Sequence, residues 1–140
     1  MHADDCPLCR DTAVALWRDD SCRVISAADA DYPGFLRVIW QAHVREMTDL
    51  DPASQQHLLR VVLAVERVLR AELAPDKINL ATLGNQVPHL HWHVIPRFAD
   101  DAHFPDPVWA ERRRAGVAHK VDRERLIRGL RSALGSSPGR

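Results

Sequence analysis

The order of apolar and polar residues changes its period several times along the chain, and each change indicates another secondary-structure element. Between residues 51 and 74, leucine and valine recur at steps of three and four, the spacing of one face of an α-helix. Asp51 supplies an N-cap and Pro52 suits the first helical position, so we expect a long amphipathic helix that starts there and ends near Pro75. A second amphipathic helix is expected over residues 122–134.

Shorter runs rich in β-branched and aromatic residues predict strands before and after the long helix. These runs are residues 22–28, 35–40, 78–83 and 90–95. A further run, residues 14–17, suits a strand or a helix, and Pro96 is expected to stop the last strand. Short connections between neighbouring runs favour antiparallel pairing. The predicted fold class is α+β, an antiparallel sheet of about five strands with the long helix packed on it and a C-terminal helix.

Composition narrows the class of protein. The 140 residues suit a single domain over residues 1–134 with a flexible tail over residues 135–140. Nineteen basic residues balance nineteen acidic ones, unlike a protein that binds nucleic acid through bulk charge. No apolar run reaches membrane-spanning length, and the polar N-terminus has no signal-peptide core. Because three cysteines are too few for a disulfide framework, we expect a cytoplasmic protein. The charge balance and the lack of a long apolar run lead us to expect neither a nucleic-acid nor a membrane partner.

Three of the eight histidines, His89, His91 and His93, alternate with apolar residues in the last expected strand. Side chains alternate between the faces of a strand, so the three imidazoles should share one face while Trp92 lies on the core side. Two protonated imidazoles about 7 Å apart would repel by about 2 kcal/mol at an effective dielectric of about 20. At least one should therefore be neutral near pH 7, with a lone pair for nucleophilic attack or metal binding.

The residues alone leave three interpretations of this face open. It is a solvated surface strand, a metal site that needs further ligands from elsewhere, or a catalytic site with a histidine nucleophile. Trp109 lies in a proline-interrupted segment after the strand and is a candidate for a substrate or dimer contact.

The segment His-Leu-His-Trp-His-Val-Ile-Pro-Arg at residues 89–97 resembles the signature of the histidine-triad (HIT) family. The resemblance covers about residues 6–97. It includes the Cys-Pro-Leu-Cys opening at residues 6–9, the motif at residues 32–39 with His43 after it, and the segment at residues 79–87. It implies a HIT-like fold and an enzyme that hydrolyses or transfers the nucleotidyl group of a phosphoanhydride or phosphoramidate, such as a dinucleoside polyphosphate.

The resemblance also implies roles for single residues. His91 would attack the α-phosphorus and form a covalent nucleotidyl-histidine, and His89 and His93 would hydrogen-bond around it. No metal is required for this chemistry, and family members are usually homodimers. The expected substrate-binding residues are Asn79, Gly84, Asn85, Gln86 and Val87.

Some members of the family bind a structural zinc through two such cysteines, the histidine of the second motif and the first triad histidine. Here these residues would be Cys6, Cys9, His43 and His89. The alternative is that the two cysteines are ordinary reduced thiols. For the whole chain, the alternative to an enzyme is a non-catalytic nucleotide-binding or zinc-stabilised interaction module.

The chain departs from the family pattern near the expected nucleoside pocket. Phe35 stands where many members have a further histidine, and Gln86 replaces the usual serine or threonine before the triad. Ala27 or Ala28, with Asp29 nearby, stands where a carboxylate or amide often binds the ribose. These departures leave the nucleoside specificity open.

Overall fold

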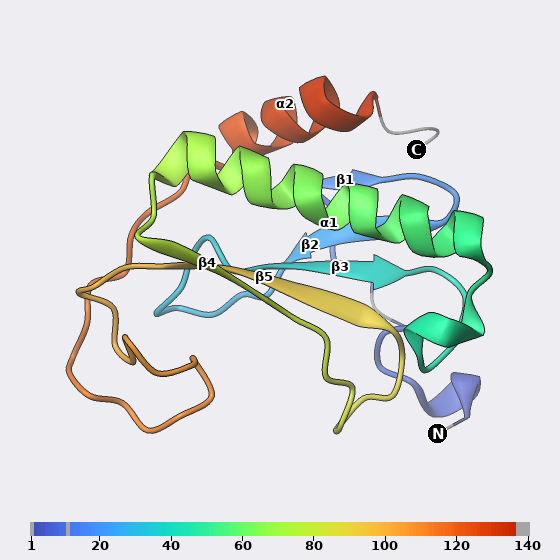
Figure 1. The fold of residues 1–140 in the computed structure, drawn as a ribbon, viewed down its shortest axis with the longest axis horizontal. Helices are drawn as coiled ribbons and strands as arrows, with labels where there is room; N and C mark the ends of the chain where they lie inside the picture. Colours follow the sequence, from blue (N-terminus) through green and yellow to red (C-terminus); the bar gives the residue numbers. More distant parts are fainter. Residues whose placement is uncertain (1, 11, 137–140) are drawn as a thin grey trace.

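A 22-residue helix, α1 (Pro52–Leu73), packs across one face of a five-stranded antiparallel sheet in the computed structural model, which describes residues 2–10 and 12–136 (Figure 1). The strands are β1 (Trp17–Arg18), β2 (Cys22–Ser26), β3 (Leu36–Trp40), β4 (Lys77–Ala81) and β5 (His91–Arg97). A second helix, α2 (Arg123–Leu134), and two 3-10 turns, η1 (Ala3–Asp5) and η2 (Met47–Asp49), complete the elements. The predicted α+β class with about five strands is confirmed.

Both helices begin and end where local chemistry favours it. The Asp51 side chain accepts a 2.8 Å hydrogen bond from the Ser54 backbone N–H, and Pro52 occupies the first turn of α1. Ala74, in the left-handed conformation at φ 47°, ends α1. The side chain of Asp122 caps α2 in the same way as Asp51 caps α1.

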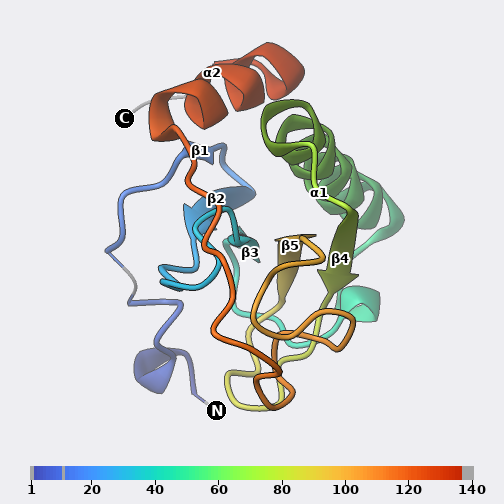
Figure 2. The same cartoon turned by 90° about the vertical axis from the view of Figure 1, so that its left-hand side faces the viewer.

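The two helices lie side by side on the same face of the sheet (Figure 2). Between them and the sheet is the main core, built from buried side chains of α1 such as Leu58 and Val62 and of the strands such as Val38 and Val94. The N-terminal segment and the long segment that follows β5 lie on the other side of the sheet (Figure 2). The layers therefore leave one sheet face available for a site.

The strands are ordered β1-β2-β3-β5-β4, which places β5 between β3 and β4. In this register His91 lies opposite Ile39, and His93 lies between Arg37 of β3 and Ala81 of β4. Residues that are paired across strands point to the same face of a sheet, so Arg37 accompanies the histidines on the face away from the helices.

Strand β5 does not stop at Pro96, contrary to the prediction. It continues to Arg97, with Pro96 opposite Ile78 of β4. Pairing with β3 ends at Val94, so Pro96 has a partner strand on one side only. The missing N–H of proline is tolerated because it can face the side without a partner.

At the C-terminal end, the Gly135 carbonyl accepts a 2.9 Å hydrogen bond from the Trp17 indole N–H. Residues 137–140 of the predicted tail lie outside the described residues. Within the described part of the chain, no helix has the length and apolar character that crossing a bilayer requires.

Candidate active site and metal site

Strand β5 places His91 and His93 together on the sheet face opposite the helices, as the alternation of the sequence predicts. Their ring centroids are 5.0 Å apart, and both side chains are buried. Trp92 packs on the main core instead, and its indole N–H lies 3.4 Å from the Met47 sulfur. The apolar residues of β5 therefore anchor the strand while its histidines face the opposite side.

The two histidines line a cavity of about 380 Å³. The predicted substrate-binding residues at positions 84–87 line this cavity as well. The complete lining is Leu8, Arg37, Leu83, Gly84, Asn85, Gln86, Val87, His91, His93 and Trp109. Gly84 adopts a positive φ of 75°, which suits the turn between β4 and β5. A second cavity of about 370 Å³ shares Leu83, Gly84 and His91, so His91 lies between two hollows.

The hydrogen bond of His91 fixes its tautomer. Its Nδ1 lies 2.5 Å from the backbone carbonyl oxygen of His89, and a carbonyl only accepts, so Nδ1 carries the proton. The lone pair is therefore on Nε2. Burial lowers the pKa of His91, and the nearby Arg37 guanidinium lowers it further. A neutral imidazole with its lone pair on Nε2 is competent as a nucleophile at neutral pH.

His93 is held neutral by its surroundings. Burial, with smaller effects from His91 and Arg37, lowers its pKa to about 4. The rings of Phe35 and Trp109 pack edge-on against it, with centroids 5.6 and 5.1 Å away. Its Nδ1 is buried and has no hydrogen-bond partner among the described residues.

His89 points elsewhere. Its Nε2–H donates a 2.6 Å hydrogen bond to the Trp40 carbonyl, which leaves the lone pair on Nδ1. That nitrogen lies 3.4 Å from Cys6 Sγ, 3.5 Å from Cys9 Sγ and 3.2 Å from His43 Nδ1. The ring of His89 is thus part of a cysteine–histidine cluster and not of the cavity wall around His93. Its backbone carbonyl, rather than its ring, contacts His91.

The four predicted metal-ligating residues do come together. Their ligand atoms all lie within 4.8 Å of one another, and Cys9 Sγ is 3.4 Å from His43 Nδ1. Zinc–sulfur and zinc–nitrogen bonds of about 2.3 and 2.0 Å give tetrahedron edges of about 3.3–3.8 Å, close to these separations. The N-terminal segment is tied to the sheet by the Arg23 side chain, which donates a 2.8 Å hydrogen bond to the Leu8 carbonyl. Two thiols and two imidazole nitrogens in this arrangement fit a structural zinc.

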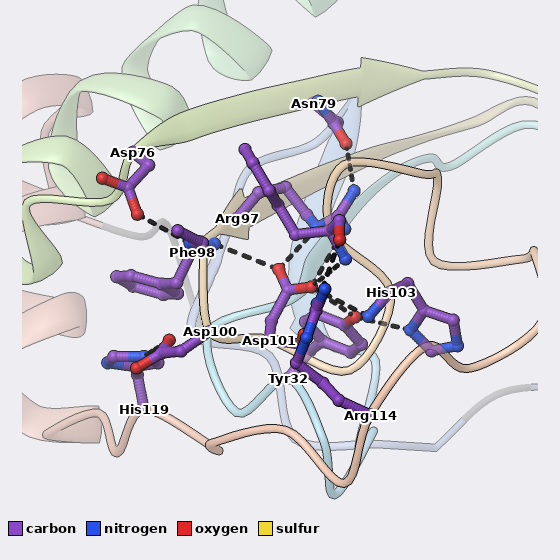
Figure 3. A network of polar contacts seen from close by, with 12 residues as sticks. Tyr32, Asp76, Asn79, Arg97, Phe98, Asp100, Asp101, His103, Arg114 and His119 are labelled. Atoms are coloured by element: carbon purple, nitrogen blue, oxygen red, sulfur yellow. Dashed lines mark hydrogen bonds and ion pairs between the residues drawn. The ribbon is translucent and has the colours of Figure 1, made fainter.

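Asn79 lies outside the cavity of His91. Its side-chain oxygen accepts a 2.8 Å hydrogen bond from Arg97 (Figure 3). Asn79 lines a separate hollow with Pro105, Pro107 and Trp109. The sequence does not indicate this partner, because the two residues meet only through the register of β4 and β5.

Arg97 also pairs with Asp101, and this buried ion pair organises the segment after β5 (Figure 3). The carboxylate accepts hydrogen bonds from two Arg97 nitrogens at 2.8 and 3.0 Å and from the Tyr32 hydroxyl at 3.1 Å. These hydrogen bonds hold the pKa of Asp101 well below its usual range, against the effect of burial, whereas burial and the carboxylate raise that of Tyr32 to about 12. The same segment brings Trp109 over His93, although Trp109 itself is 52% exposed.

Comparison with protein families matches residues 10–100 of the chain to the HIT domain. A solved histidine triad protein from Bradyrhizobium japonicum is 32% identical, with a TM-score of 0.71 over 89% of this chain and 92% of that one. A zinc-bound histidine triad family protein from Mycobacterium smegmatis is 24% identical, with a TM-score of 0.63 and 95% of each chain covered. The second likeness concerns the fold alone.

Two curated relatives act on nucleotides according to their names. The asymmetrical bis(5'-nucleosyl)-tetraphosphatase of Schizosaccharomyces pombe is 32% identical over 84 residues, which are 56% of this chain and 46% of that protein. The AP-4-A phosphorylase of Mycobacterium tuberculosis is 33% identical over 78 residues, 51% of this chain and 40% of that protein. The chain therefore spans less than half the length of these relatives.

Proposed function

Since the chain belongs to the HIT domain family, we propose that it cleaves a nucleotide phosphoanhydride or phosphoramidate, by hydrolysis or nucleotidyl transfer. A dinucleoside polyphosphate is the substrate class that the names of the curated relatives favour. The single observation that carries the proposal is the hydrogen bond from His91 Nδ1 to the His89 carbonyl, which leaves the lone pair on Nε2 of a histidine that lines a cavity of nucleotide-binding size.

The proposed reaction has two displacement steps at phosphorus. His91 Nε2 donates its lone pair to the α-phosphorus, a phosphorus–nitrogen bond forms, and the bond to the leaving oxygen or nitrogen breaks. The leaving group departs with the electron pair and takes up a proton. Water then attacks the same phosphorus, the phosphorus–nitrogen bond breaks, and neutral His91 is regenerated as the nucleotide is released with a proton. While the adduct exists the imidazole is cationic, and the His89 carbonyl stabilises its Nδ1–H.

Polar groups at residues 84–87 would contact the phosphate oxygens from the other side of the cavity. The side chains of Asn85 and Gln86 both line it. Asn79 is not assigned to the phosphate, because its side-chain oxygen already accepts from Arg97.

Hydrolysis assays with the purified protein test the proposal. Wild-type protein is incubated with a panel of dinucleoside polyphosphates and nucleoside phosphoramidates, and rapid acid quench with intact mass analysis looks for a nucleotidyl adduct. His91→Ala should lose hydrolysis and the adduct. His57→Ala, which removes a histidine that pairs with Asp19 away from the cavity, should keep both. Unchanged hydrolysis by His91→Ala would show that the nucleophile is wrongly assigned.

The competing function is a nucleotide-binding module without turnover. It would give stoichiometric binding of nucleotides by calorimetry, no product and no adduct with any substrate of the panel. The lone pair on His91 favours the enzyme, since binding alone does not require an unprotonated nitrogen aimed at the ligand.

The cysteine–histidine cluster holds a structural zinc in this proposal, with Cys6, Cys9, His43 and His89 as its ligands. Four protein ligands close the coordination shell and leave no position for substrate, so the metal fixes the N-terminal segment rather than taking part in catalysis. Metal analysis should find one equivalent per chain in the wild type and a loss in Cys9→Ser. His119→Asn is the matched control, because the His119 ring pairs with Asp100 away from this cluster. A metal-free wild type of equal stability would refute this assignment.

A further inference from the structure

We infer that Arg37 of β3 is the phosphate-binding residue of the cavity, and that its guanidinium contacts the non-bridging oxygens of the phosphate that His91 attacks. This inference rests on the proposed function of His91. It assigns a role to a residue that neither the triad nor the segment at residues 84–87 includes.

The sheet register places Arg37 beside the triad. Arg37 lies directly opposite His93 in the β3–β5 pair, and Ile39 lies opposite His91. Residues in one cross-strand pair share a face, so the Arg37 side chain is on the same face as both histidines. It also lines the same cavity as His91, His93 and residues 84–87. An anion bound against His91 would therefore lie within the space that Arg37 borders.

Arg37 is half-buried, and its Nε lacks a hydrogen-bond partner among the residues that the structure describes. Its Cζ lies 5.8 Å from the centroid of the Phe35 ring. Within residues 2–10 and 12–136, no carboxylate forms an ion pair with it. Arg97, at the end of the neighbouring strand β5, differs from Arg37 because Asp101 neutralises its charge. A donor without an acceptor is costly, and an anion in the cavity that Arg37 lines would supply acceptors for its guanidinium.

The charges in the cavity lead to the same conclusion. Of the ten residues that line it, Arg37 is the only arginine or lysine, and none is an aspartate or a glutamate. A phosphoanhydride brings several negative charges, and phosphoryl transfer relies on positioning and charge neutralisation. The planar guanidinium presents paired N–H groups that match two phosphate oxygens. Without Arg37 no arginine or lysine would line the cavity that holds the polyanion.

A purely structural role, in which Arg37 stacks on Phe35, makes different predictions. In that case Arg37→Met should have little effect on ligand binding, because methionine is an unbranched apolar side chain that can pack against Phe35 as the aliphatic part of arginine does. The phosphate-binding role requires the positive charge instead. Arg37→Lys should keep part of the phosphate affinity, because lysine keeps the positive charge but lacks the paired N–H groups of the guanidinium. Glutamine and methionine at this position should keep none of it.

Binding of nucleoside monophosphates, compared with binding of the matching nucleosides, tests the inference separately from turnover. Calorimetry is performed with AMP, GMP, CMP and UMP and their nucleosides on wild type, Arg37→Lys, Arg37→Gln and Arg37→Met. Arg67→Gln, which removes an exposed arginine of α1, is the charge-matched control. Circular dichroism and thermal melting check that each variant is folded.

We expect Arg37→Gln and Arg37→Met to weaken monophosphate binding by at least tenfold and to leave nucleoside binding unchanged. The ratio kcat/KM for a hydrolysed dinucleoside polyphosphate should fall by about 100-fold, as for loss of one anion-stabilising donor, with Arg37→Lys in between. Arg67→Gln should match the wild type. If monophosphate affinity depends on Arg37 but no substrate is turned over, the binding role stands and the enzymatic proposal fails.

Two results would overturn the inference. One is hydrolysis and monophosphate affinity in Arg37→Gln equal to those of the wild type, in which case His91 keeps its proposed role and Arg37 does not. The other is a wild type that binds none of the four monophosphates more tightly than their nucleosides.

Discussion

Replacement of Asp101 by asparagine should destabilise the protein strongly, although the two side chains have almost the same shape. Asp101 is buried and accepts six hydrogen bonds: two from Arg97, one from the Tyr32 hydroxyl and three from backbone N–H groups of the segment that follows β5. Asparagine would turn one accepting oxygen into an NH2 group. In either orientation of the amide, its NH2 group would face at least two of the N–H or O–H groups that now donate to Asp101.

The magnitude follows from the burial of the ion pair. The side chain of Arg97 is 2% exposed and that of Asp101 is 1% exposed, so Asp101→Asn leaves an uncompensated guanidinium in the interior. Breaking a buried pair by removing one partner costs about 3–5 kcal/mol. Because a domain of this size is stable by about 5–15 kcal/mol, the variant should unfold at a much lower denaturant concentration.

Urea denaturation followed by circular dichroism measures this loss, with Asp106→Asn as the control. Asp106 forms an ion pair with Arg113 in the same segment, but that pair is largely exposed and screened by solvent. The control should therefore unfold near the wild-type midpoint. If Asp101→Asn also unfolds there at pH 7, the buried network does not stabilise the fold as argued.

The pH dependence provides a second check on the same variant. The pKa of Asp101 is lower in the folded protein than the usual value of 3.8, so its contribution is complete above that value. As the pH falls from there toward the folded pKa, the contribution is lost. The stability difference between wild type and Asp101→Asn should therefore shrink at acidic pH and be constant between pH 5 and 7.

Three further predictions follow from the site and the packing. The acid limb of kcat/KM should have its midpoint below pH 6.5, because burial lowers the pKa of His91 and so keeps its lone pair available, and a midpoint at or above 6.5 would contradict this lowered pKa. Gly129→Ala should destabilise the protein by about 1–3 kcal/mol in urea melts. The reason is that the Cβ of an alanine at position 129 would lie 2.9 Å from a methyl carbon of Val68 of α1. Ser132→Ala, on the exposed side of α2, is the control and should have little effect. Equal urea midpoints for Gly129→Ala and the wild type would refute the close contact between the helices. Light scattering should give twice the 15.8 kDa chain mass if the expected homodimer forms, and a monomer mass would reject it.

The helices and the triad strand could be predicted because their signals are local. The capping residues Asp51 and Pro52 and the three-to-four spacing after them specify α1, and alternation specifies which face His91 and Trp92 occupy. The continuation of β5 through Pro96 could not be predicted, since it depends on where the pairing of a distant strand ends. Local pattern determines an element and its faces, whereas pairing decides how far it extends.

In the candidate site, too, the features set by local sequence could be predicted and those set by strand pairing could not. Residues 84–87 line the cavity as expected because the chain must turn there before the triad. Asn79 does not, because Arg97 takes its oxygen across the β4–β5 pair. Arg37 is a charged residue inside an apolar strand run, and the sequence alone gives it no partner. Its position beside His93 depends on the register of β3 and β5, which the sequence does not reveal.

Three identical residues at alternate positions have different surroundings, and the hydrogen bonds explain the difference. His89 donates from Nε2 to Trp40 and so turns its lone pair toward Cys6 and Cys9, while its carbonyl accepts the proton of His91 Nδ1. One residue therefore joins the cysteine cluster to the proposed nucleophile. Its ring anchors the segment, and its backbone sets the tautomer. In the proposed reaction, only the middle histidine has both an orienting acceptor and a free nitrogen facing the cavity, which is why the attack is assigned to His91 and to neither neighbour.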